Sequence, residues 1–320
     1  MGRDIEKVVV VTRRTRLQLL EERYATREQA RFVLTRGAEL RAGTADGSGR
    51  DPSRDFEDLE AEHATYQEAV ERVLGQMDPA LKVQVLDRAL VPTFLFTERD
   101  AIVALGQDGL VANVAKYTGA QPIIGVNPDP ARIDGVLLPF HAGEVGTVLA
   151  AVRRRTARVR EVTLAEAVLD DGQRMRAFNE LFIGASTHVS ARYRIRHHGY
   201  GEAQSSSGVL VCTGAGSTGW LSSVYTMAGA ITGTEAPRGV HPWEDQGLTF
   251  VVREPFVSKT SGAQVVFGRV MPGEALVVES MMAGEGVIFS DGIEKDFCAF
   301  PSGRVATVAA APERARLVVR

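Results

Sequence analysis

The stretch "AIVALGQDGLVANVAKYTG" (residues 101–119) decides the fold, because it reads as a strand, a glycine turn and a helix in succession. Its first five residues form an apolar run typical of a buried strand, and apolar residues recur at helical spacing after the second glycine. A strand, turn and helix in this order present backbone N–H groups and a helix N-terminus to phosphate oxygens. Asp108 then stands where it can accept a hydroxyl proton or help to hold a metal ion. The alternative is a Gly-Asp-Gly turn without a ligand.

Strands and helices alternate over the first part of the chain. We expect strands at 7–12, 82–86, 101–105 and 121–127, and helices at 16–36, closed by Gly37, and at about 56–77. The polar Gly/Ser/Asp segment 41–55 is interpreted as a loop. Strands that are separated by helices predict a parallel sheet with helices on both faces, a Rossmann-like α/β domain.

After about residue 137 short strands dominate, and helices become few. Many short strands predict an antiparallel sandwich-like domain. One of the turns between these strands is expected at Asp291-Gly292, a pair typical of hairpins. We therefore expect an α/β domain over 1–137, a β-rich domain over 138–300, and C-terminal strands over 301–320 that return to the first domain. Ligands commonly bind between such domains, so the active site is expected in the cleft between them.

The segment "RAFNELFIG" (176–184) places Asn179 and Glu180 side by side within an apolar strand. Neighbours in a strand point to opposite faces, so one of the two should be buried or face a ligand. A buried glutamate needs a partner, and the hydroxyls of a ribose would supply one, while an asparagine can pair with a base edge. The alternative is an edge strand whose polar residues are solvated.

The segment "SSSGVLVCTGAGSTGWLSSV" (205–224) leads from a strand through a glycine-rich loop into an expected helix. Glycines allow a ligand to approach the backbone, the hydroxyl side chains can bind phosphate or sugar, and Trp220 offers a stacking face. The spacing matches neither a P-loop nor a Gly-X-Gly-X-X-Gly dinucleotide fingerprint. An ordinary Gly/Ser loop is the competing interpretation.

Composition limits the classes of partner. The net charge is −3 over 320 residues, which gives no general case for nucleic acid or a membrane surface. No run approaches the ~20 apolar residues of a membrane span, the N-terminus lacks a signal-peptide hydrophobic region, and two cysteines exclude a disulfide framework. We therefore expect a cytoplasmic protein. His197-His198 could bind a metal, but no cysteine or carboxylate pattern completes a site, so solvated turn histidines are expected and no metal ligand is assigned.

The three motifs together resemble those of the NAD kinases. The family's "GGDG" corresponds to Gly106-Gln107-Asp108-Gly109, its "NE" to Asn179-Glu180, and its "DGxxxSTPTGSTAY" to "SGVLVCTGAGSTGW" (207–220). Order and spacing agree over most of the chain, and "IIGVNPDPARIDGVLLPF" (123–140) is most similar to the mitochondrial-type branch. The resemblance implies phosphorylation of the adenosine-ribose 2′-hydroxyl of NAD or NADH by ATP with Mg²⁺, with polyphosphate as an alternative donor.

The resemblance also implies roles for individual residues. Asp108 would be the general base, and Asn179 and Glu180 would bind the adenosine part of NAD. The remaining positions implied to contact the nucleotides are Gly106, Gln107, Gly109, Ser207, Gly216, Ser217, Thr218, Gly219, Trp220 and Ser223. The family resemblance further suggests a homodimer or larger homo-oligomer.

Some positions depart from the family's pattern. Gln107 replaces a glycine at the phosphate turn, Ser207 replaces an aspartate, and Gly219-Trp220 replaces Ala-Tyr. Gln107 could redirect or weaken catalysis. Two other functions therefore stay open, a non-catalytic sensor of NAD(H) or NADP(H) and a related kinase that acts on a lipid or sugar hydroxyl. The preference between NAD and NADH is also open.

Overall fold

The computed structural model describes residues 4–42, 52–235 and 239–320, which group into two compact units. The first unit comprises the chain up to Val111, Ile123–Arg158 and the last three residues, Val318–Arg320. The second unit comprises Ala112–Pro122 and Val159–Leu317. An α/β unit and a β-rich unit are thus both present, as expected from the sequence.

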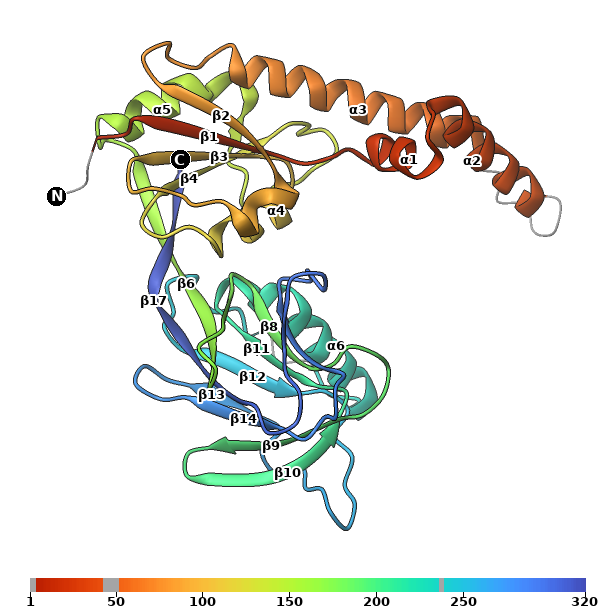
Figure 1. Ribbon diagram of the computed structural model, residues 1–320, viewed down its shortest axis with the longest axis vertical. Coiled ribbons are helices and arrows are strands. Elements are labelled where there is room, and N and C mark those ends of the chain that lie inside the picture. The colour runs from red at the N-terminus through yellow and green to blue at the C-terminus, as the bar shows by residue number, and fades with distance from the viewer. Residues whose placement is uncertain (1–3, 43–51, 236–238) are drawn as a thin grey trace. The chain divides into compact units, whose positions relative to one another are not determined.

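The first unit is built on a parallel sheet with the strand order β4-β3-β1-β2 (Figure 1). The strands are β1 (Lys7–Thr12), β2 (Lys82–Asp87), β3 (Asp100–Leu105), β4 (Pro122–Asn127) and the short β5 (Phe140–His141), which pairs with β4. The valines of β1 and all six residues of β3 are buried, because central strands of a parallel sheet are covered on both faces. The sequence-based strands agree with these four main strands.

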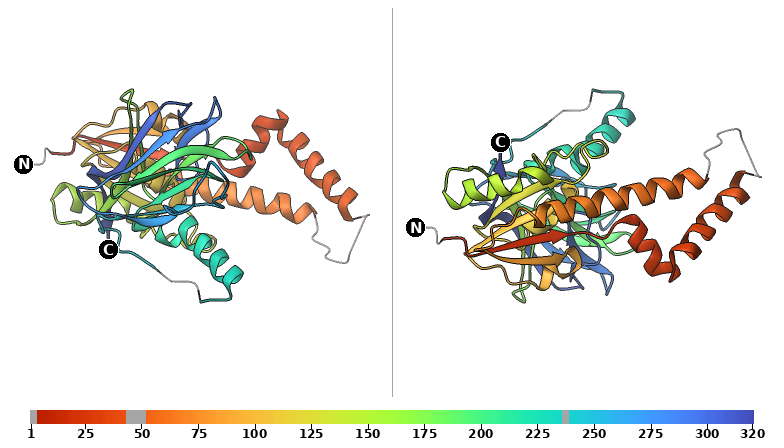
Figure 2. Two further views of the ribbon diagram at one scale, coloured as in Figure 1. Left: turned by 90° about the horizontal axis from the view of Figure 1, so that it is seen from below. Right: turned by 90° about the horizontal axis from the view of Figure 1, so that it is seen from above.

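Helices of the first unit cover the sheet and also extend beyond it. They are α1 (Arg16–Tyr24), α2 (Arg27–Ala42), α3 (Pro52–Leu74), the first part of α4 (Asp108–Ala115) and α5 (Val145–Arg153), with 3₁₀ turns η1 (Arg88–Thr93) and η2 (Ala142–Glu144). Figure 2 shows α2 leading away from the sheet and α3 returning to it. Leu17, Ala30, Phe56 and Leu59 form a small core among α1, α2 and α3.

The helices differ from the expectations in three places. The helix expected over 16–36 is two helices, because Ala25 ends α1 in the left-handed conformation (φ 65°), and α2 continues through Gly37 to Ala42. Of the loop expected over 41–55, residues 43–51 lie outside the described residues, and the remaining positions belong to α2 and α3. Helix α5 was not expected, although its buried Val145, Leu149 and Val152 recur at helical spacing.

The second unit contains two groups of strands. One group comprises β6 (Arg158–Leu169), β7 (Arg174–Ala177), β9 (Ala191–His197), β10 (Tyr200–Ser206), β14 (Leu276–Ser280) and β17 (Val305–Val319). The other is a six-stranded antiparallel sheet, in the order β13-β12-β11-β8-β15-β16, formed by β8 (Glu180–Ala185), β11 (Val209–Cys212), β12 (Leu248–Val252), β13 (Phe267–Val270), β15 (Gly286–Ser290) and β16 (Phe297–Ala299). The turn η3 (Ala215–Thr218) and helix α6 (Trp220–Thr232) follow β11.

One hydrophobic core joins these two groups of strands. It includes Tyr193 and Val278 from the first group, and Ile183, Phe250 and Ile288 from the second, all buried. The unit is therefore layered, with apolar side chains of both groups facing each other. Among the described residues, no helix has the length and apolar character that crossing a membrane requires.

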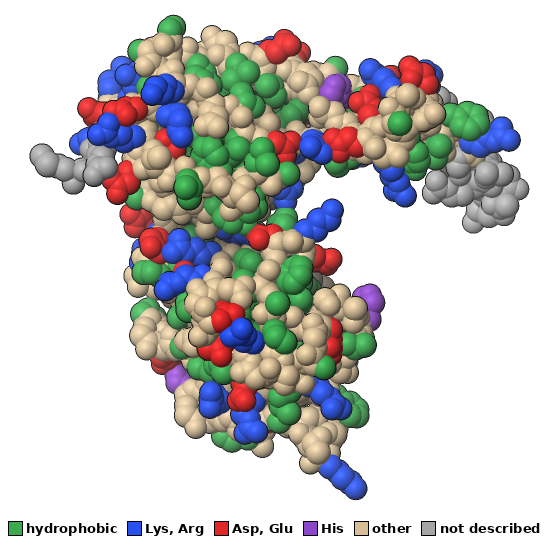
Figure 3. All heavy atoms as spheres, in the orientation of Figure 1, with side chains coloured by type: hydrophobic (Ala, Val, Ile, Leu, Met, Phe, Trp, Pro, Cys, Tyr) green, Lys and Arg blue, Asp and Glu red, His purple; other side chains and the backbone are tan. Residues whose placement is uncertain are grey.

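The visible surface carries mixed charge. On the face drawn in Figure 3, acidic and basic side chains are interspersed over the described residues of both units. This distribution agrees with the small net charge of −3. Many of the arginines are paired: Arg153 pairs with Asp78, and Arg160 pairs with Glu244. The positive charges of Arg153, at the end of α5, and of Arg160, in β6, are therefore neutralised by neighbouring acids.

Candidate functional site

The Gly-Gln-Asp-Gly turn joins β3 to α4 in the first unit. Gly106 is buried, and its N–H donates to the Val126 carbonyl at 3.2 Å. A Cβ at Gly106 would lie 2.9 Å from Leu110 Cδ2, so the turn packs tightly at its first glycine. A Cβ at Gly109 would meet nothing within 4 Å, so the second glycine lies beside open space. The backbone at Gly109 is thus accessible to a ligand.

Asp108 is the first residue of α4, and its carboxylate is held by two backbone groups. Oδ1 accepts from the Leu137 N–H at 2.7 Å, and Oδ2 accepts from the Val136 N–H at 3.2 Å. The loop that supplies these groups turns at Gly135, whose φ is 66°. A carboxylate offers about four lone-pair sites, so two remain for a proton donor. Asp108 is therefore fixed in place, half-buried, and still able to accept a hydrogen bond.

A cavity of about 320 Å³ lies at the carboxyl ends of the parallel strands. Its lining comes from segments that directly follow three strands: Arg13 after β1, Gln107 after β3, and Pro128, Asp129, Arg132 and Ile133 after β4; Arg16, Glu62 and Tyr66 complete it. The strand order reverses between β1 and β3, since β2 lies on one side of β1 and β4 beyond β3 on the other. Open α/β sheets bind ligands at such a reversal, at the carboxyl ends of the strands.

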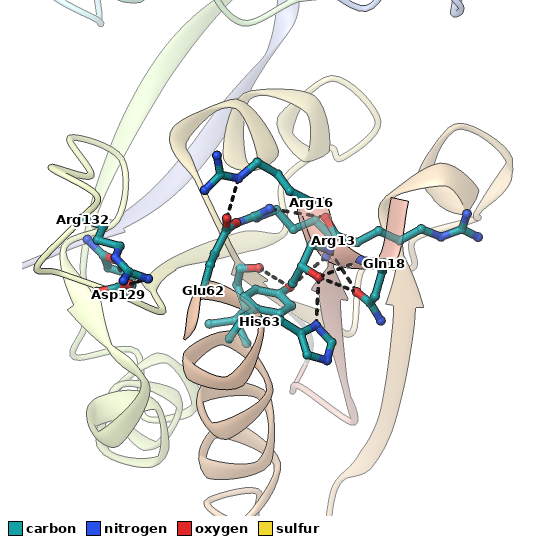
Figure 4. Close-up of polar contacts among 12 residues, drawn as sticks. Arg13, Arg16, Gln18, Glu62, His63, Asp129 and Arg132 are labelled. Carbon is teal, nitrogen blue, oxygen red and sulfur yellow. Dashed lines mark hydrogen bonds and ion pairs between the residues drawn. The ribbon is translucent and has the colours of Figure 1, made fainter. Parts of the chain in front are cut away.

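Glu62 of α3 links two of the arginines in this cavity (Figure 4). One oxygen accepts from Arg13 at 3.0 Å and the other from Arg16 Nε at 2.6 Å. The two arginines hold the pKa of Glu62 below its usual value, against the effect of burial, so Glu62 is ionised. Arg13 Nε is buried without a hydrogen-bond partner. An arginine in this state has unused capacity to bind an anion.

Tyr66 lines the cavity and holds two of the neighbouring strand ends in place. Its hydroxyl donates to the Leu105 carbonyl at 2.9 Å, at the end of β3, and accepts from the Arg13 N–H at 2.8 Å. Burial raises the pKa of Tyr66 to about 12, so the hydroxyl stays protonated. One side chain of α3 thereby ties the ends of β1 and β3 together where the strand order reverses. The guanidinium of Arg13 also lies 5.2 Å from the Tyr66 ring centroid.

Asn179 and Glu180 lie at the start of β8 in the second unit, and Asp291 holds their backbone. The Asp291 carboxylate accepts from the N–H groups of Phe178, Asn179 and Glu180 at 3.0, 2.7 and 3.3 Å. Asp291 and Gly292 both have positive φ, 53° and 69°. The hairpin expected there from the sequence thus also serves as a clamp on the Asn-Glu pair.

Glu180 is buried, with 8% of its surface exposed, as one of the pair was expected to be. Burial, and next the negative charge of Asp291, raise the pKa of Glu180 to about 7. Nearby Lys116 is also buried and donates to Ser290 at 2.8 Å. Its positive charge opposes the effect of burial on Asp291, whose pKa is nevertheless raised by desolvation. Lys116 also pairs with Asp296 at 3.6 Å, so three carboxyl groups and one ammonium share this polar cluster.

The glycine-rich loop packs directly against the Asn-Glu pair. A Cβ at Gly216 would lie 2.1 Å from the Asn179 carbonyl oxygen, and one at Gly219 would lie 3.8 Å from Glu180 Oε2. Thr213 donates through its hydroxyl to the Phe178 carbonyl at 2.6 Å and accepts from the Gly216 N–H at 3.1 Å. The structure therefore brings together the two motifs that the sequence placed in separate segments.

The other residues of this segment that were expected to contact the nucleotide differ in their exposure to solvent. Ser217 is buried; its hydroxyl donates to the Gly214 carbonyl at 2.7 Å and accepts from the His241 N–H at 3.1 Å. Thr218 and Ser223 are exposed. Ser217 thus has structural partners of its own, whereas the two exposed hydroxyls are open to a ligand.

Trp220 and Ser207 are linked through Arg253. The Trp220 ring stacks on Phe182, with centroids 5.9 Å apart and planes 5° apart, and the Arg253 guanidinium lies 5.1 Å from the Trp220 ring centroid. The exposed Ser207 donates its N–H to the Arg253 carbonyl at 2.9 Å. The stacking face expected of Trp220 therefore already has an aromatic and a cationic neighbour.

Sequence reasoning missed several polar residues around these two centres. They are Arg13, Arg16, Glu62, Tyr66, Asp129 and Arg132 in the cavity, and Lys116 and Asp291 in the second unit. A usable signal existed for Arg13, because it directly follows the first parallel strand. The residues of α3 gave no such signal, since only the tertiary fold brings that helix to the strand ends.

A prediction concerns the stability contributed by Glu180. Its pKa is raised in the folded chain, so between about pH 4.5 and pH 7 the folded state binds more protons than the unfolded state. Stability therefore falls as pH rises through this window. The variant Glu180→Gln should lack this pH dependence. As the pH rises from 5 to 8, its free energy of unfolding should therefore increase by about 2–3 kcal/mol relative to that of the parent. Urea unfolding of both proteins across this range measures the difference; equal pH slopes would contradict the assignment.

The fold belongs to the class seen in solved structures of kinases that act on nicotinamide nucleotides. The crystal structure of yeast NADH kinase complexed with NADH aligns with 99% of this chain and 84% of its own, with a TM-score of 0.58 and 14% identity. An NAD kinase from Archaeoglobus fulgidus in complex with ATP aligns with 98% of this chain and 93% of its own, with a TM-score of 0.54 and 16% identity. At these identities the likeness establishes the fold.

The relatives found by sequence are also named NAD kinases. The chain is 27% identical to rat mitochondrial NAD kinase 2 over 272 residues, 69% of this chain and 61% of that protein, and 26% identical to the human protein over 269 residues, 69% and 58%. It is 33% identical to an NAD kinase of Halobacterium salinarum over 135 residues, 40% of this chain and 48% of the relative. No protein-family model matches. The resemblance to NAD kinases is confirmed, and the chain spans about 60% of the length of the mitochondrial relatives.

Proposed function

We propose that the protein is an NAD kinase that transfers the γ-phosphoryl group of Mg·ATP to the adenosine-ribose 2′-hydroxyl of NAD or NADH. The observation that carries this proposal is Asp108, fixed by two backbone N–H groups at the start of α4. The neighbouring Gln107 lines an arginine-bearing cavity at the strand ends. The names of the sequence relatives support the same conclusion.

The donor phosphates would bind in the cavity of the first unit. Arg13, Arg16 and Arg132 supply positive charge there, against the negative charge of Glu62 and Asp129. Arg13 lines the cavity and its buried Nε has no hydrogen-bond partner, so a rotation of the side chain would let it donate to a phosphate oxygen. The exposed side chain of Gln107 adds a further polar group at the same wall, where the family has a glycine. Gln107 would thereby influence which donor fits.

Mg²⁺ fits this cavity because hard cations prefer oxygen ligands and are commonly held by one or two carboxylates together with phosphates. Glu62 and Asp129 are the carboxylates in the lining. When bound, the ion would neutralise charge on the donor phosphates. Asp129 is held near Arg132, with 3.7 Å between Oδ2 and the guanidinium nitrogen, and Asn127 Oδ1 accepts from the Asp129 N–H at 3.0 Å.

Asp108 would act as the general base on the acceptor hydroxyl. Its free lone pairs accept the hydroxyl proton as the oxygen attacks phosphorus, while the Val136 and Leu137 N–H groups keep the carboxylate oriented. Phosphoryl transfer requires mainly positioning and charge stabilisation, so one base and a set of arginines suffice as protein groups.

The β-rich domain expected over 138–300 would bind the dinucleotide. Glu180, when ionised, accepts from ribose hydroxyls, and Asn179 pairs with the adenine edge. The packing of Gly216 on Asn179 and of Gly219 beside Glu180 supports a shared binding surface for the two motifs. Thr218 and Ser223 would add hydroxyl contacts, because both are exposed.

The test is transfer of radiolabelled phosphate from γ-labelled ATP to a panel of acceptors: NAD, NADH, a sugar and diacylglycerol. We expect label only in NAD or NADH, and phosphorus NMR of the product should show a 2′-phosphate monoester. Label in the lipid or sugar instead would favour the related kinase. Calorimetric binding of NAD(H) without transfer from any donor would favour the sensor.

A further inference from the structure

The histidine pair His197-His198 lies at the turn between β9 and β10, and the fold brings a carboxylate to it. Strand β14 pairs antiparallel with β9, with Val277 opposite Arg196. This register places Glu274, three residues before Val277, beside the turn. One ligand-type atom from each of His197, His198 and Glu274 lies within 4.8 Å of the others. No carboxylate partner was expected for the pair, because Glu274 is distant along the chain.

His197 is not the solvated side chain that the sequence predicted. It follows Tyr193 and Ile195 on the buried side of β9, and its ring meets Phe250 edge-on with centroids 4.9 Å apart. Its Nε2 is buried and has no hydrogen-bond partner. The Arg269 backbone hydrogen-bonds the ring. A backbone hydrogen bond to one ring nitrogen orients the other nitrogen toward a metal ion.

His198 and Glu274 are the more exposed members of the cluster. His198 Nε2 lies 3.7 Å from Glu274 Oε2, and their side chains are 59% and 35% exposed. The Glu274 carboxylate is positioned by the Met271 N–H, which donates to Oε2 at 2.9 Å. His198 adopts a left-handed conformation (φ 50°) that turns the chain back at Gly199. Both side chains can therefore rotate toward His197 without a change in the strands.

We propose that His197, His198 and Glu274 form a binding site for a divalent transition-metal ion, for which Zn²⁺ is the best match. Zn²⁺ binds imidazole nitrogen and carboxylate oxygen at ~2.0–2.2 Å, so its ligand atoms stand roughly 3.4 Å apart. The ligand atoms, which lie within 4.8 Å of one another, reach that spacing by moving together by at most about 1.4 Å, which rotation of the His198 and Glu274 side chains can supply. Three protein ligands and one solvent-facing position complete a tetrahedral site.

This site differs in chemistry from the Mg²⁺ expected with ATP. Mg²⁺ prefers oxygen ligands, whereas two imidazoles select borderline ions such as Zn²⁺. The bound ion would join the turn between β9 and β10 to the turn between β13 and β14, because its ligands come from both. The proposal therefore does not depend on the kinase activity.

The experiment titrates metal-free, tag-free protein with Zn²⁺ in the absence of nucleotide and Mg²⁺, with a chromophoric chelator as competitor; Co²⁺ provides an absorption spectrum of the site. We expect one equivalent of Zn²⁺ per chain and a Co²⁺ spectrum of tetrahedral type. The variants His198→Asn and Glu274→Gln should each weaken binding by ~10-fold or more, the scale at which disturbed metal sites lose affinity. Asparagine tolerates the left-handed conformation, so the first variant preserves the turn.

The matched control is His188→Ala, which removes an exposed histidine outside the cluster and should leave binding unchanged. His197→Ala is a less suitable variant, because His197 also packs on Phe250. Circular dichroism checks that each variant is folded. Absence of stoichiometric binding to the parent protein would overturn the proposal, and so would affinities of His198→Asn and Glu274→Gln that equal the affinity of the parent. A loss in His188→Ala equal to that in the cluster variants would do the same.

Discussion

The variant Asp108→Asn should lower kcat by ~10²-fold or more, because it removes the proposed general base while it keeps the size and shape of the side chain. The asparagine oxygen can still accept the Leu137 N–H, now at 2.7 Å, but the amide cannot also accept from Val136. One lost backbone hydrogen bond costs about 1 kcal/mol of stability, too little to unfold the protein. Steady-state kinetics at saturating Mg·ATP and acceptor measures the effect.

Two controls separate a catalytic effect from a structural one. Asp134→Asn changes an exposed aspartate of the same unit and should leave kcat unchanged. NAD affinity, measured by calorimetry, should be nearly the same in Asp108→Asn and the parent protein. Turnover that is retained in Asp108→Asn would remove this residue from the mechanism, and a parallel loss of NAD affinity would assign it a binding role instead.

The variant Asp291→Ala should reduce the free energy of unfolding by about 2–4 kcal/mol, because it removes a charged acceptor that several backbone N–H groups share. The carboxylate accepts from three consecutive N–H groups, at Phe178, Asn179 and Glu180, and it balances the buried Lys116. Alanine removes this acceptor from the three N–H groups, while Lys116 keeps its ion pair with Asp296. Chemical denaturation measures the stability. Calorimetry should show weakened NAD binding as well, because the Asn-Glu pair loses its backbone clamp.

Comparison variants define what the Asp291 carboxylate contributes. Asp291→Asn retains one acceptor oxygen and suits the positive φ of 53°, so it should lose less stability than the alanine variant. Glu294→Ala changes an exposed residue of the same turn and should stay within about 0.5 kcal/mol of the parent. Equal stabilities for Asp291→Ala and Glu294→Ala would contradict the clamp.

Much of the fold could be predicted from local patterns. The β-branched run of β1 and the apolar runs of β3 and β4 predicted buried parallel strands, because each run was bounded by turn residues. The break at Ala25 was not expected, since alanine favours helix, although the exposed Ala25 is followed by Thr26, whose hydroxyl accepts from the Gln29 N–H at the start of α2. The continuation of α2 through Gly37 was not expected either, because Gly37 was expected to end the helix. A glycine within a helix weakens the helix but does not have to end it.

The candidate site was predictable where its residues share a short motif. Asp108 and the Asn179-Glu180 pair were found because a carboxylate beside glycines, and a polar pair in an apolar strand, are unusual locally. The arginine-lined cavity was not found, because it unites residues from α3 with the ends of β1, β3 and β4. Asp291 was interpreted only as a turn residue. Its carboxylate contacts β8, and no spacing in the sequence records that contact.

The measurement that tests the central claim most directly is formation of phosphorylated dinucleotide by the purified protein. The protein is incubated with Mg·ATP and either NAD or NADH in parallel reactions, and NADP(H) is detected with an NADP-specific dehydrogenase. The account predicts product from at least one acceptor, and its loss in Asp108→Asn. A folded protein that binds NAD(H) but forms no NADP(H) from either acceptor would contradict the account.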